Sequence, residues 1–321
     1  MHDRLDAVGA VAWSELHART SLRSPFLTWA WQREWAAAFA PDQRLGIWRV
    51  SDASGLVAVL PLYEAEPDVW RILGGIDVSD YLDLIAVAGR EEEAWTALLG
   101  ARTTAGTVWD LHAVPATSPT VTAMPSLAGA GGLEAKVAVE DRCPVLALPT
   151  SWEAYLASLS GKHRHELTRK MRRLEREAPD ATCVSVATPE PIADRLDDFL
   201  ALHRRSRVGK ARFMDERMET FFRRALAALA ERGMASLWFL DAPTGPLAAF
   251  VTLEWDGSVG LYNSGFDPDR AQLSPGLVLL AHLHRDAIAR GKRCFDFLRG
   301  EERYKYEFGP TPQDVCTVRI S

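Results

Sequence analysis

The sequence has few cysteines and no long apolar run. Its four cysteines, spread over 321 residues, include no CxxC pair, and each lies in an apolar stretch typical of a strand. We therefore expect buried, reduced thiols rather than a disulfide framework or a zinc site. The histidines show no metal-ligand spacing, so no metal is expected. No stretch has the apolar length that spans a membrane, and the charged N-terminus lacks a signal-peptide core. These absences predict a cytoplasmic protein.

An excess of charge of one sign is also absent over the chain as a whole. The formal net charge is -6, with 25% charged and 47% hydrophobic residues, which is typical of a globular protein and argues against general coating of nucleic acid. The exception is residues 162–176, where seven Lys or Arg accompany two Glu. Because Leu167, Met171 and Leu174 share one face of this helix, a solvated basic surface is expected. Contact with a phosphate or polyanion is the alternative.

Periodic apolar residues predict helices and strands throughout the chain. Trp31, Trp35 and Phe39 recur four residues apart and would share a buried helix face. Asp256-Gly257, between two apolar runs, is the strongest hairpin signal. A series of helices and strands in the first half recurs in nearly the same order in the second. This order predicts two copies of one mixed α/β fold, residues 1–149 and 150–321.

One strand-to-helix junction in the second half has a specific pattern. A strand from Val259 to Ser264 leads through a polar turn to a helix that begins Ser274-Pro275-Gly276. Ser274 is expected to cap the helix, and Pro275 suits its first position because no N–H is needed there. Gly276 would let a ligand approach the backbone closely. Such a junction is a ready anion site, with an ordinary connecting helix as the alternative.

The second half contains a series of short motifs, namely Lys162-x-Arg164-x-x-Leu167-x-Arg169, Tyr262-x-x-Gly265-x-Asp267, Ser274-Pro275-Gly276, Phe295-Asp296-Phe297 and Gly300-Glu301-x-x-Tyr304-Lys305-x-x-Phe308. Together these motifs resemble those of the GNAT acyltransferases. In its two-copy arrangement the chain resembles the Fem-type transferases and the acetyltransferases of the cellulose-biosynthesis type. The first half matches more loosely, through Pro25-Phe26 with Trp31 and through Asp80-Tyr81-x-Asp83. The resemblance implies tandem GNAT-like domains and an N-acyltransferase.

The resemblance also implies acyl-CoA as the acyl donor, bound at the start of a helix. In the first half the corresponding helix begins with Glu91, Glu92 and Glu93. These carboxylates already satisfy the helix dipole and would repel a diphosphate, so we assign the co-substrate to the second half. GNAT enzymes carry a Gln/Arg-x-x-Gly-x-Gly/Ala loop there, and this chain departs from it. The residues expected to hold the donor are Arg270, Gln272, Ser274, Gly276 and Leu277.

Acyl transfer needs a neutral amine, support for the tetrahedral oxyanion and a proton for the leaving group. A carboxylate is a natural base, and the candidates are Glu254, Asp296 and Glu301. Glu254 lies beside a hairpin turn and is expected to be exposed. Asp296 lies on a predicted central strand, where a buried carboxylate needs a partner or a raised pKa. A structural acid bonded to backbone amides is an equal alternative for Asp296.

An aromatic-Lys pair follows this strand at Tyr304-Lys305. The resemblance to Fem-type enzymes implies that the pair lies in the transfer site. Lys305 would stabilise the oxyanion or hold an acidic group of the substrate, and Tyr304 could donate a proton. The alternative for Lys305 is a surface ion pair with Glu301 or Glu302.

The acceptor is expected to be a small or peptide-like amine that enters between the two halves. Residues expected near it are Asp80, Tyr81, Asp83, Tyr262 and Arg207. The two aspartates would alternatively be ordinary turn or capping residues. Two other functions stay open. The donor could be an aminoacyl-tRNA contacted by residues 162–176, or the chain could be a non-catalytic paired fold that binds a ligand or partner.

Overall fold

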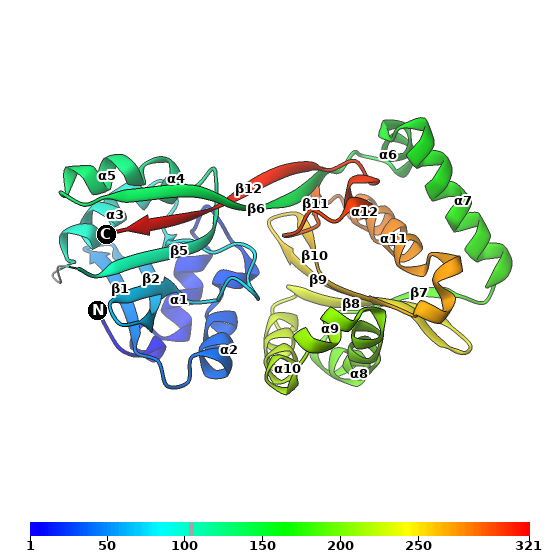
Figure 1. Ribbon diagram of the computed structural model, residues 1–321, viewed down its shortest axis with the longest axis horizontal. Coiled ribbons are helices and arrows are strands. Elements are labelled where there is room, and N and C mark those ends of the chain that lie inside the picture. The colour runs from blue at the N-terminus through cyan, green and yellow to red at the C-terminus, as the bar shows by residue number, and fades with distance from the viewer. Residues whose placement is uncertain (103–105) are drawn as a thin grey trace. The chain divides into compact units, whose positions relative to one another are not determined.

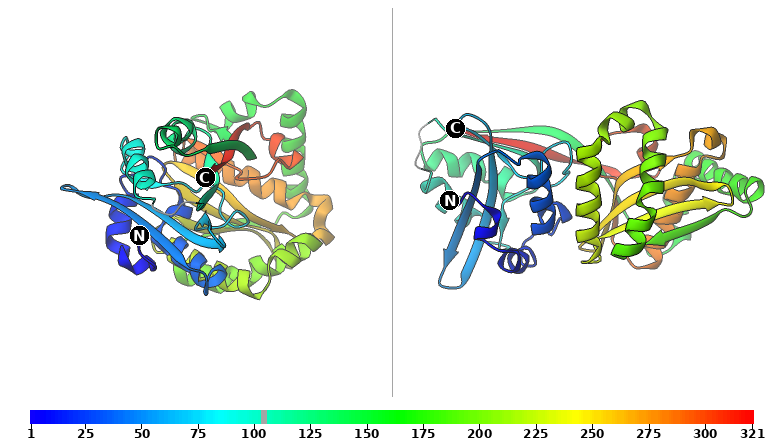
Figure 2. Two further views of the ribbon diagram at one scale, coloured as in Figure 1. Left: turned by 60° about the vertical axis from the view of Figure 1, so that its left-hand side comes forward. Right: turned by 90° about the horizontal axis from the view of Figure 1, so that it is seen from below.

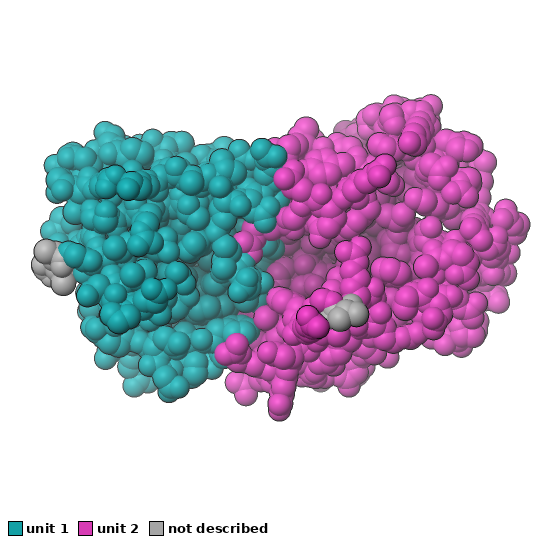
Figure 3. All heavy atoms as spheres, in the orientation of Figure 1, with its two compact units in different colours: residues 1–142, 313–321 teal, residues 143–312 magenta. Residues whose placement is uncertain are grey.

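The computed structural model describes residues 1–102 and 106–321. The chain forms two compact units, one of residues 1–142 with 313–321 and the other of residues 143–312 (Figure 3). The boundary between the units lies after residue 142, within strand β6 (Ala135–Ala147), whereas the sequence predicted a boundary after residue 149. Residues 313–321 join the first unit, since the end of β12 (Thr311–Ile320) pairs antiparallel with β5 (Val108–Pro115).

The first unit contains a mixed sheet. Its strands follow the order β1, β2, β3, β5, β12, with β4 beside β2. β1 and β2 form an antiparallel hairpin, whereas β3 and β5 run parallel. Parallel strands need a crossover connection, and this one includes helix α3. The bounds are β1 Leu45–Asp52, β2 Gly55–Glu66, β3 Val69–Ile72, β4 Ile85–Ala86 and α3 Glu91–Gly100.

Aromatic side chains form much of the first unit's core. Thr28 caps helix α2 (Trp29–Phe39) by accepting a hydrogen bond from the Trp31 amide at 3.3 Å. Trp31 and Trp35 are buried and Phe39 contacts Trp35, which confirms the predicted core face. The other helical segments of this unit are η1 Leu5–Ala7, α1 Ala10–His17, η2 Pro25–Leu27, α4 Pro119–Thr122 and α5 Met124–Ala130.

In the second unit the strands follow the order β6, β11, β10, β9, β8, β7, with both parallel and antiparallel pairs. The β9–β10 hairpin turns at Asp256 and Gly257, whose φ angles of 46° and 74° are the left-handed values that a tight hairpin requires. The predicted turn is therefore confirmed. The bounds are β7 Thr182–Val186, β8 Ala235–Ala242, β9 Gly245–Trp255, β10 Ser258–Phe266 and β11 Cys294–Asp296.

Helices cover both faces of the second unit's sheet (Figures 1 and 2). On one face lie α8, α9 and α10; on the other, α11 packs on the sheet, with α6 and α7 against it. A Cβ on Gly265 would lie 2.6 Å from the His203 amide nitrogen, so α8 approaches β10 very closely. The bounds are α6 Trp152–Ser158, α7 Gly161–Glu177, α8 Pro189–Ser206, α9 Val208–Phe213, α10 Glu216–Ala230, η3 Pro268–Leu273, α11 Pro275–Ala289 and α12 Arg303–Tyr306.

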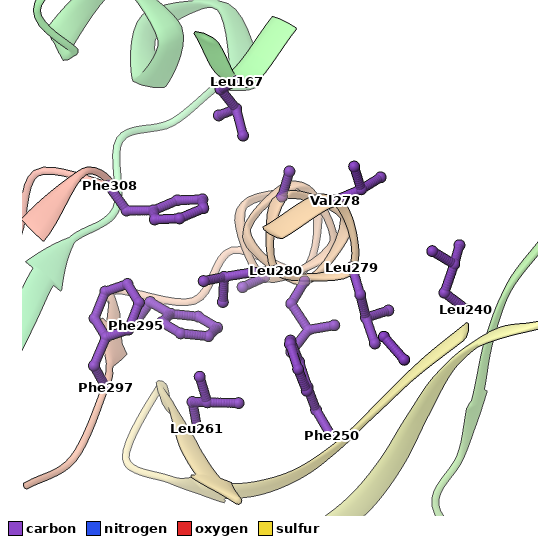
Figure 4. Close-up of a cluster of buried hydrophobic side chains, with 14 of the residues drawn as sticks. Leu167, Leu240, Phe250, Leu261, Val278, Leu279, Leu280, Phe295, Phe297 and Phe308 are labelled. Carbon is purple, nitrogen blue, oxygen red and sulfur yellow. The ribbon is translucent and has the colours of Figure 1, made fainter. Parts of the chain in front are cut away.

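Helix α11 lies at the centre of the second unit's core (Figure 4). Its residues Val278, Leu279 and Leu280 are buried, and Figure 4 shows side chains from several elements around it. These include Phe250 of β9, Leu261 of β10 and Leu167 of α7, together with Phe295, Phe297 and Phe308. Because α11 is packed on all these sides, its amino end is held firmly in place.

Strands β10 and β11 separate beside the amino end of α11. Their parallel pairing covers Ser258–Gly260 of β10 and ends at Asp296 of β11. Beyond this point β10 continues to Phe266 alongside β9, with an irregularity between Leu261 and Asn263. The two parallel strands therefore pair only over their first residues.

Candidate active site

The start of helix α11 differs from the sequence expectation in one respect. Ser274 adopts a left-handed conformation (φ 51°, ψ 45°), and its side chain makes no capping hydrogen bond. The prediction that Ser274 caps the helix is therefore wrong, because this backbone turns the side chain away from the first helical amides. Pro275 occupies the first helical position, as predicted. The Ser274 side chain thus leaves the N–H groups of the first turn to another partner.

A cavity of about 310 Å³ opens at this helix start, lined by residues of the second unit. A Cβ on Gly276 would find its nearest neighbour, the Phe250 Cζ, at 4.0 Å, so the space beside this glycine is open. Of the predicted site residues, those that line the cavity are Arg207, Ser274, Gly276, Leu277 and Tyr304. Sequence reasoning missed other lining residues, which include Lys210, Phe250, Ser264, Phe266 and Glu302.

Two cations and one carboxylate line this cavity. The Lys210 Nζ donates to the Ser264 carbonyl and, at 3.0 Å, to the Ser264 Oγ. Burial, with a smaller contribution from Arg207, lowers the Lys210 pKa to about 8. Burial is the largest single influence on Glu302 and opposes its ionisation, but the hydrogen bond and charge of Lys305, with smaller contributions from a backbone hydrogen bond and Arg207, together lower the Glu302 pKa. Since Glu302 already has a cationic partner outside the lining, the cavity wall carries a positive excess.

Lys305 is buried and holds the loop after β11. Its Nζ donates to the carbonyls of Arg299 and Gly300, both at 2.9 Å, and pairs with the Glu302 carboxylate at 2.9 Å. Lys305 is not among the residues that line the cavity. The structure therefore differs from the expectation of a lysine facing the transferred group. The reason is that these loop carbonyls need a buried donor.

Tyr304 lines the cavity, whereas the predicted carboxylate bases do not. Burial raises the Tyr304 pKa, with a further contribution from Glu302, so the phenol keeps its proton near neutrality. Asp296 is buried and accepts a hydrogen bond from the Leu298 amide at 2.7 Å. Glu301 accepts from the Tyr306 hydroxyl at 2.8 Å. Glu254, expected to be exposed, is instead largely buried in ion pairs.

Three further predicted residues of the second unit occupy other positions. Arg270 and Gln272 are exposed on η3 and do not line the cavity. The Tyr262 ring stacks on Phe222 at 5.5 Å and also lies outside the cavity lining. Ser264 and Phe266 are two residues apart on one strand and therefore lie on the same face of the sheet. This spacing is the sequence signal that could have identified them as lining residues.

The predicted acceptor residues of the first half belong to the other unit. Asp83 is buried and accepts from the hydroxyls of Ser118 and Thr120, which tie it to the start of α4. Burial raises its pKa to about 6 in spite of these bonds. Tyr81 is also buried, and Asp80 is partly so. A structural contact thus accounts for Asp83, while an acceptor role for Asp80 and Tyr81 stays a prediction.

The basic helix α7 is partly neutralised by its own acids. Arg169 pairs with Glu166 at 2.8 Å, and Arg173 pairs with Glu177 at 3.1 Å. Leu167 and Leu174 are buried against the core, as the sequence predicted. In the described part of the chain, no helix is both apolar and long enough to cross a membrane. Among the same residues, no group of three or more His, Cys, Asp or Glu could hold a metal ion.

Comparison with known proteins identifies a domain within the second unit. Residues 161–306 match the family model described as acetyltransferase (GNAT) domain. No curated protein matches the chain. The matched residues include helix α11 and the residues that line the cavity at its start, so the second unit contains a GNAT-type acyltransferase domain.

Solved structures with similar folds extend the likeness to the whole chain. One is the C-terminal domain of a putative lysylphosphatidylglycerol synthetase from Agrobacterium fabrum, at 11% identity and TM-score 0.60 over 96% of this chain and 91% of that one. Another is FemX, at 12% identity and TM-score 0.62, covering 89% and 90% respectively. A conserved Bacteroides thetaiotaomicron protein of unknown function has 13% identity and TM-score 0.62, with 99% and 98% covered. The predicted Fem-like GNAT fold is confirmed.

Proposed function

We propose that the second unit binds acyl-CoA and transfers its acyl group to an amine. The observation that carries the proposal is the cavity at the start of α11, where Gly276 is open and the exposed Arg207 contributes positive charge. Helix N–H groups and nearby cations are the groups that bind phosphate in proteins. Glu302, the carboxylate in the lining, is already paired with Lys305, so repulsion of a diphosphate is reduced.

The remaining lining residues suit the other parts of the donor. Phe250, Phe266 and Leu277 provide an apolar surface for an acyl group or the pantetheine arm. Tyr304 is a neutral phenol within the same cavity, and we assign it the proton that the leaving thiolate takes up. Lys305 acts indirectly, by fixing the loop that carries Glu302 and Tyr304.

Calorimetric titration with acetyl-CoA and with longer acyl-CoAs tests this proposal. We expect saturable binding to the wild-type protein, and a series of chain lengths would show which acyl group the apolar wall prefers. Absence of binding heat with every acyl-CoA at millimolar concentration would reject the acyl-CoA donor.

A second candidate donor is aminoacyl-tRNA, which the resemblance to Fem-type transferases implies. The supporting observation is that α7 exposes basic residues such as Lys162 and Arg164. Phosphate contacts would make tRNA affinity fall steeply with salt. Binding of tRNA that does not change with salt, or no binding at all, would remove this candidate. The two titrations together decide between the donors.

A further inference from the structure

Lys210 is a titratable residue of the cavity wall whose amino group is held by two hydrogen bonds. It lies on the short helix α9, and its Nζ donates to both the carbonyl and the hydroxyl oxygen of Ser264 on β10. The same Ser264 carbonyl accepts a hydrogen bond at 3.0 Å from the Nδ1 of His203, a buried residue of α8. Three elements therefore converge on Ser264 and fix where the amino group lies.

The stereochemistry of an amine determines which direction around the Lys210 Nζ stays available to a ligand. A neutral lysine has two N–H bonds and one lone pair, whereas its ammonium form has three N–H bonds. The two Ser264 oxygens take two of the tetrahedral directions around Nζ. The remaining direction therefore carries the lone pair when Lys210 is neutral and a proton when it is charged. Because Lys210 lines the cavity, that direction is the one left for a ligand.

The groups around Lys210 act on its charge in both directions. Burial has the largest effect and disfavours the ammonium, and Arg207 and Lys305 act in the same sense. Glu302 acts in the opposite sense. His203 is kept neutral by its own burial, and Tyr304 keeps its phenolic proton. Lys210 consequently exchanges its proton at about pH 8, below the ordinary lysine value of 10.5.

We propose that Lys210 is the proton acceptor for the attacking amine in this cavity, an inference that rests on the proposed function. As the amine nitrogen bonds to the thioester carbonyl carbon, it becomes positively charged, and the Lys210 lone pair takes its proton. The carbon–sulfur bond then breaks, and Tyr304 gives a proton to the thiolate. The Lys210 ammonium and the Tyr304 phenolate return to their neutral forms by proton exchange with water.

The first test needs no substrate. The intact protein is labelled with trace acetic anhydride across a pH series, and each lysine is quantified by mass spectrometry. We expect Lys210 to reach half of its maximal reactivity near pH 8, well below the ordinary lysine value of 10.5. Lys162, an exposed lysine, is quantified in the same samples as internal reference for the reagent. Half-maximal reactivity of Lys210 near the ordinary value of 10.5 would overturn the inference whether or not the protein binds acyl-CoA.

The second test uses acetyl-CoA with hydroxylamine, an acceptor that is itself neutral throughout the range. We expect the wild-type rate to rise with pH to a plateau above about 8. Lys210→Gln and Lys210→Arg should both lose this rise and fall in rate by roughly 100-fold, the usual scale of general base catalysis. If Lys210 instead held an anion, the wild-type rate would fall above this pH and Lys210→Arg would stay active, which would overturn the proposal.

Two further outcomes separate this inference from the proposed function. If acetyl-CoA binds and Lys210→Gln transfers acetyl groups at the wild-type rate, Lys210 is not the acceptor although the function stands. A stable acetyl group on Lys210 after incubation with acetyl-CoA alone would show that its lone pair attacks the carbonyl carbon, which also contradicts the role. If acetyl-CoA does not bind the wild type, the function and the inference fall together, and the labelling result still reports the Lys210 proton.

Discussion

Each unit contains two parallel strands joined through a helix, yet the two helices begin in opposite electrostatic environments. In the first unit, α3 connects β3 to β5, and in the second, α11 connects β10 to β11. The first turn of α3 holds Glu91, Glu92 and Glu93, with Arg90 bridging Glu93 and Asp52. The first turn of α11 holds no acidic residue and opens on a cavity. The two helix starts thus differ in charge although the strand–helix–strand arrangement is shared, and the proposed anion site belongs to α11.

The most direct way to break this contrast is to give α11 the acid that α3 has. Gly276→Glu places a carboxylate in open space beside the first helical turn. We expect acyl-CoA affinity to fall by at least about 100-fold, because a like charge now faces the phosphates. The melting temperature should stay the same or rise, since an acid near a helix start is favourable. Calorimetry and thermal denaturation measure the two effects.

The matched control is Gly161→Glu, at the start of α7, where an added Cβ likewise meets nothing within 4 Å. This variant should bind acyl-CoA as the wild type does. Unchanged affinity in Gly276→Glu would contradict the assignment of the donor to α11.

A smaller effect is expected from one cation at the cavity. Arg207→Gln should weaken acyl-CoA binding by about 10-fold and reduce its salt dependence, because Arg207 is exposed and its charge is partly screened. Arg212→Gln, on the short helix α9 that follows Arg207 but outside the cavity lining, is the control and should change neither property. Equal effects of the two changes would show a general charge effect and no specific contact.

Much of this contrast could be predicted from the sequence, because it depends on local signals. Glu91–Glu93 and Ser274-Pro275-Gly276 are contiguous, and helix starts are determined by a few neighbouring residues. Lys210 and Glu302 could not be found in this way, since they meet through packing of distant elements. Lys305 was predicted from a resemblance, and only the tertiary structure shows that loop carbonyls surround its ammonium. The capping role of Ser274 was predicted wrongly because the residue type gives no indication of its left-handed backbone conformation.

One histidine in each unit extends the comparison to the pH dependence of stability. His112 lies between Asp110 and Glu140 in the first unit, and these acids raise its pKa to about 9. Its stabilising effect is complete below pH 6.5 and is lost as the pH rises toward 9. Burial lowers the His203 pKa in the second unit to about 4, so its effect is complete above pH 6.5 and is lost as the pH falls toward 4.

We therefore expect alkaline conditions to weaken the first unit and acidic conditions the second. Allowing for screening, each change should be on the order of 2 kcal/mol in the free energy of unfolding. Hydrogen exchange of β5 and β10 peptides across the pH range would resolve the units. His112→Gln should abolish the alkaline loss alone, and persistence of that loss would contradict its origin in His112.

The smallest effect is expected at Asp83, where a structural and a substrate-binding role predict different outcomes. Because the side chain is buried against Ser118 and Thr120, Asp83→Asn should leave KM for the acceptor unchanged. The stability of the protein should change by less than about 1 kcal/mol near neutral pH, because burial penalises the ionised carboxylate, raising its pKa to about 6, and removal of the charge relieves that penalty. A KM raised severalfold without loss of stability would instead support contact between Asp83 and the acceptor.

The measurement that tests the central claim most directly is hydrogen exchange of the wild-type protein with and without acyl-CoA. If the donor's phosphates bind the amides at the start of α11, exchange should slow at residues 276–279 and stay unchanged at residues 91–94. Slower exchange at residues 91–94, or bound acyl-CoA with no change at residues 276–279, would contradict the account.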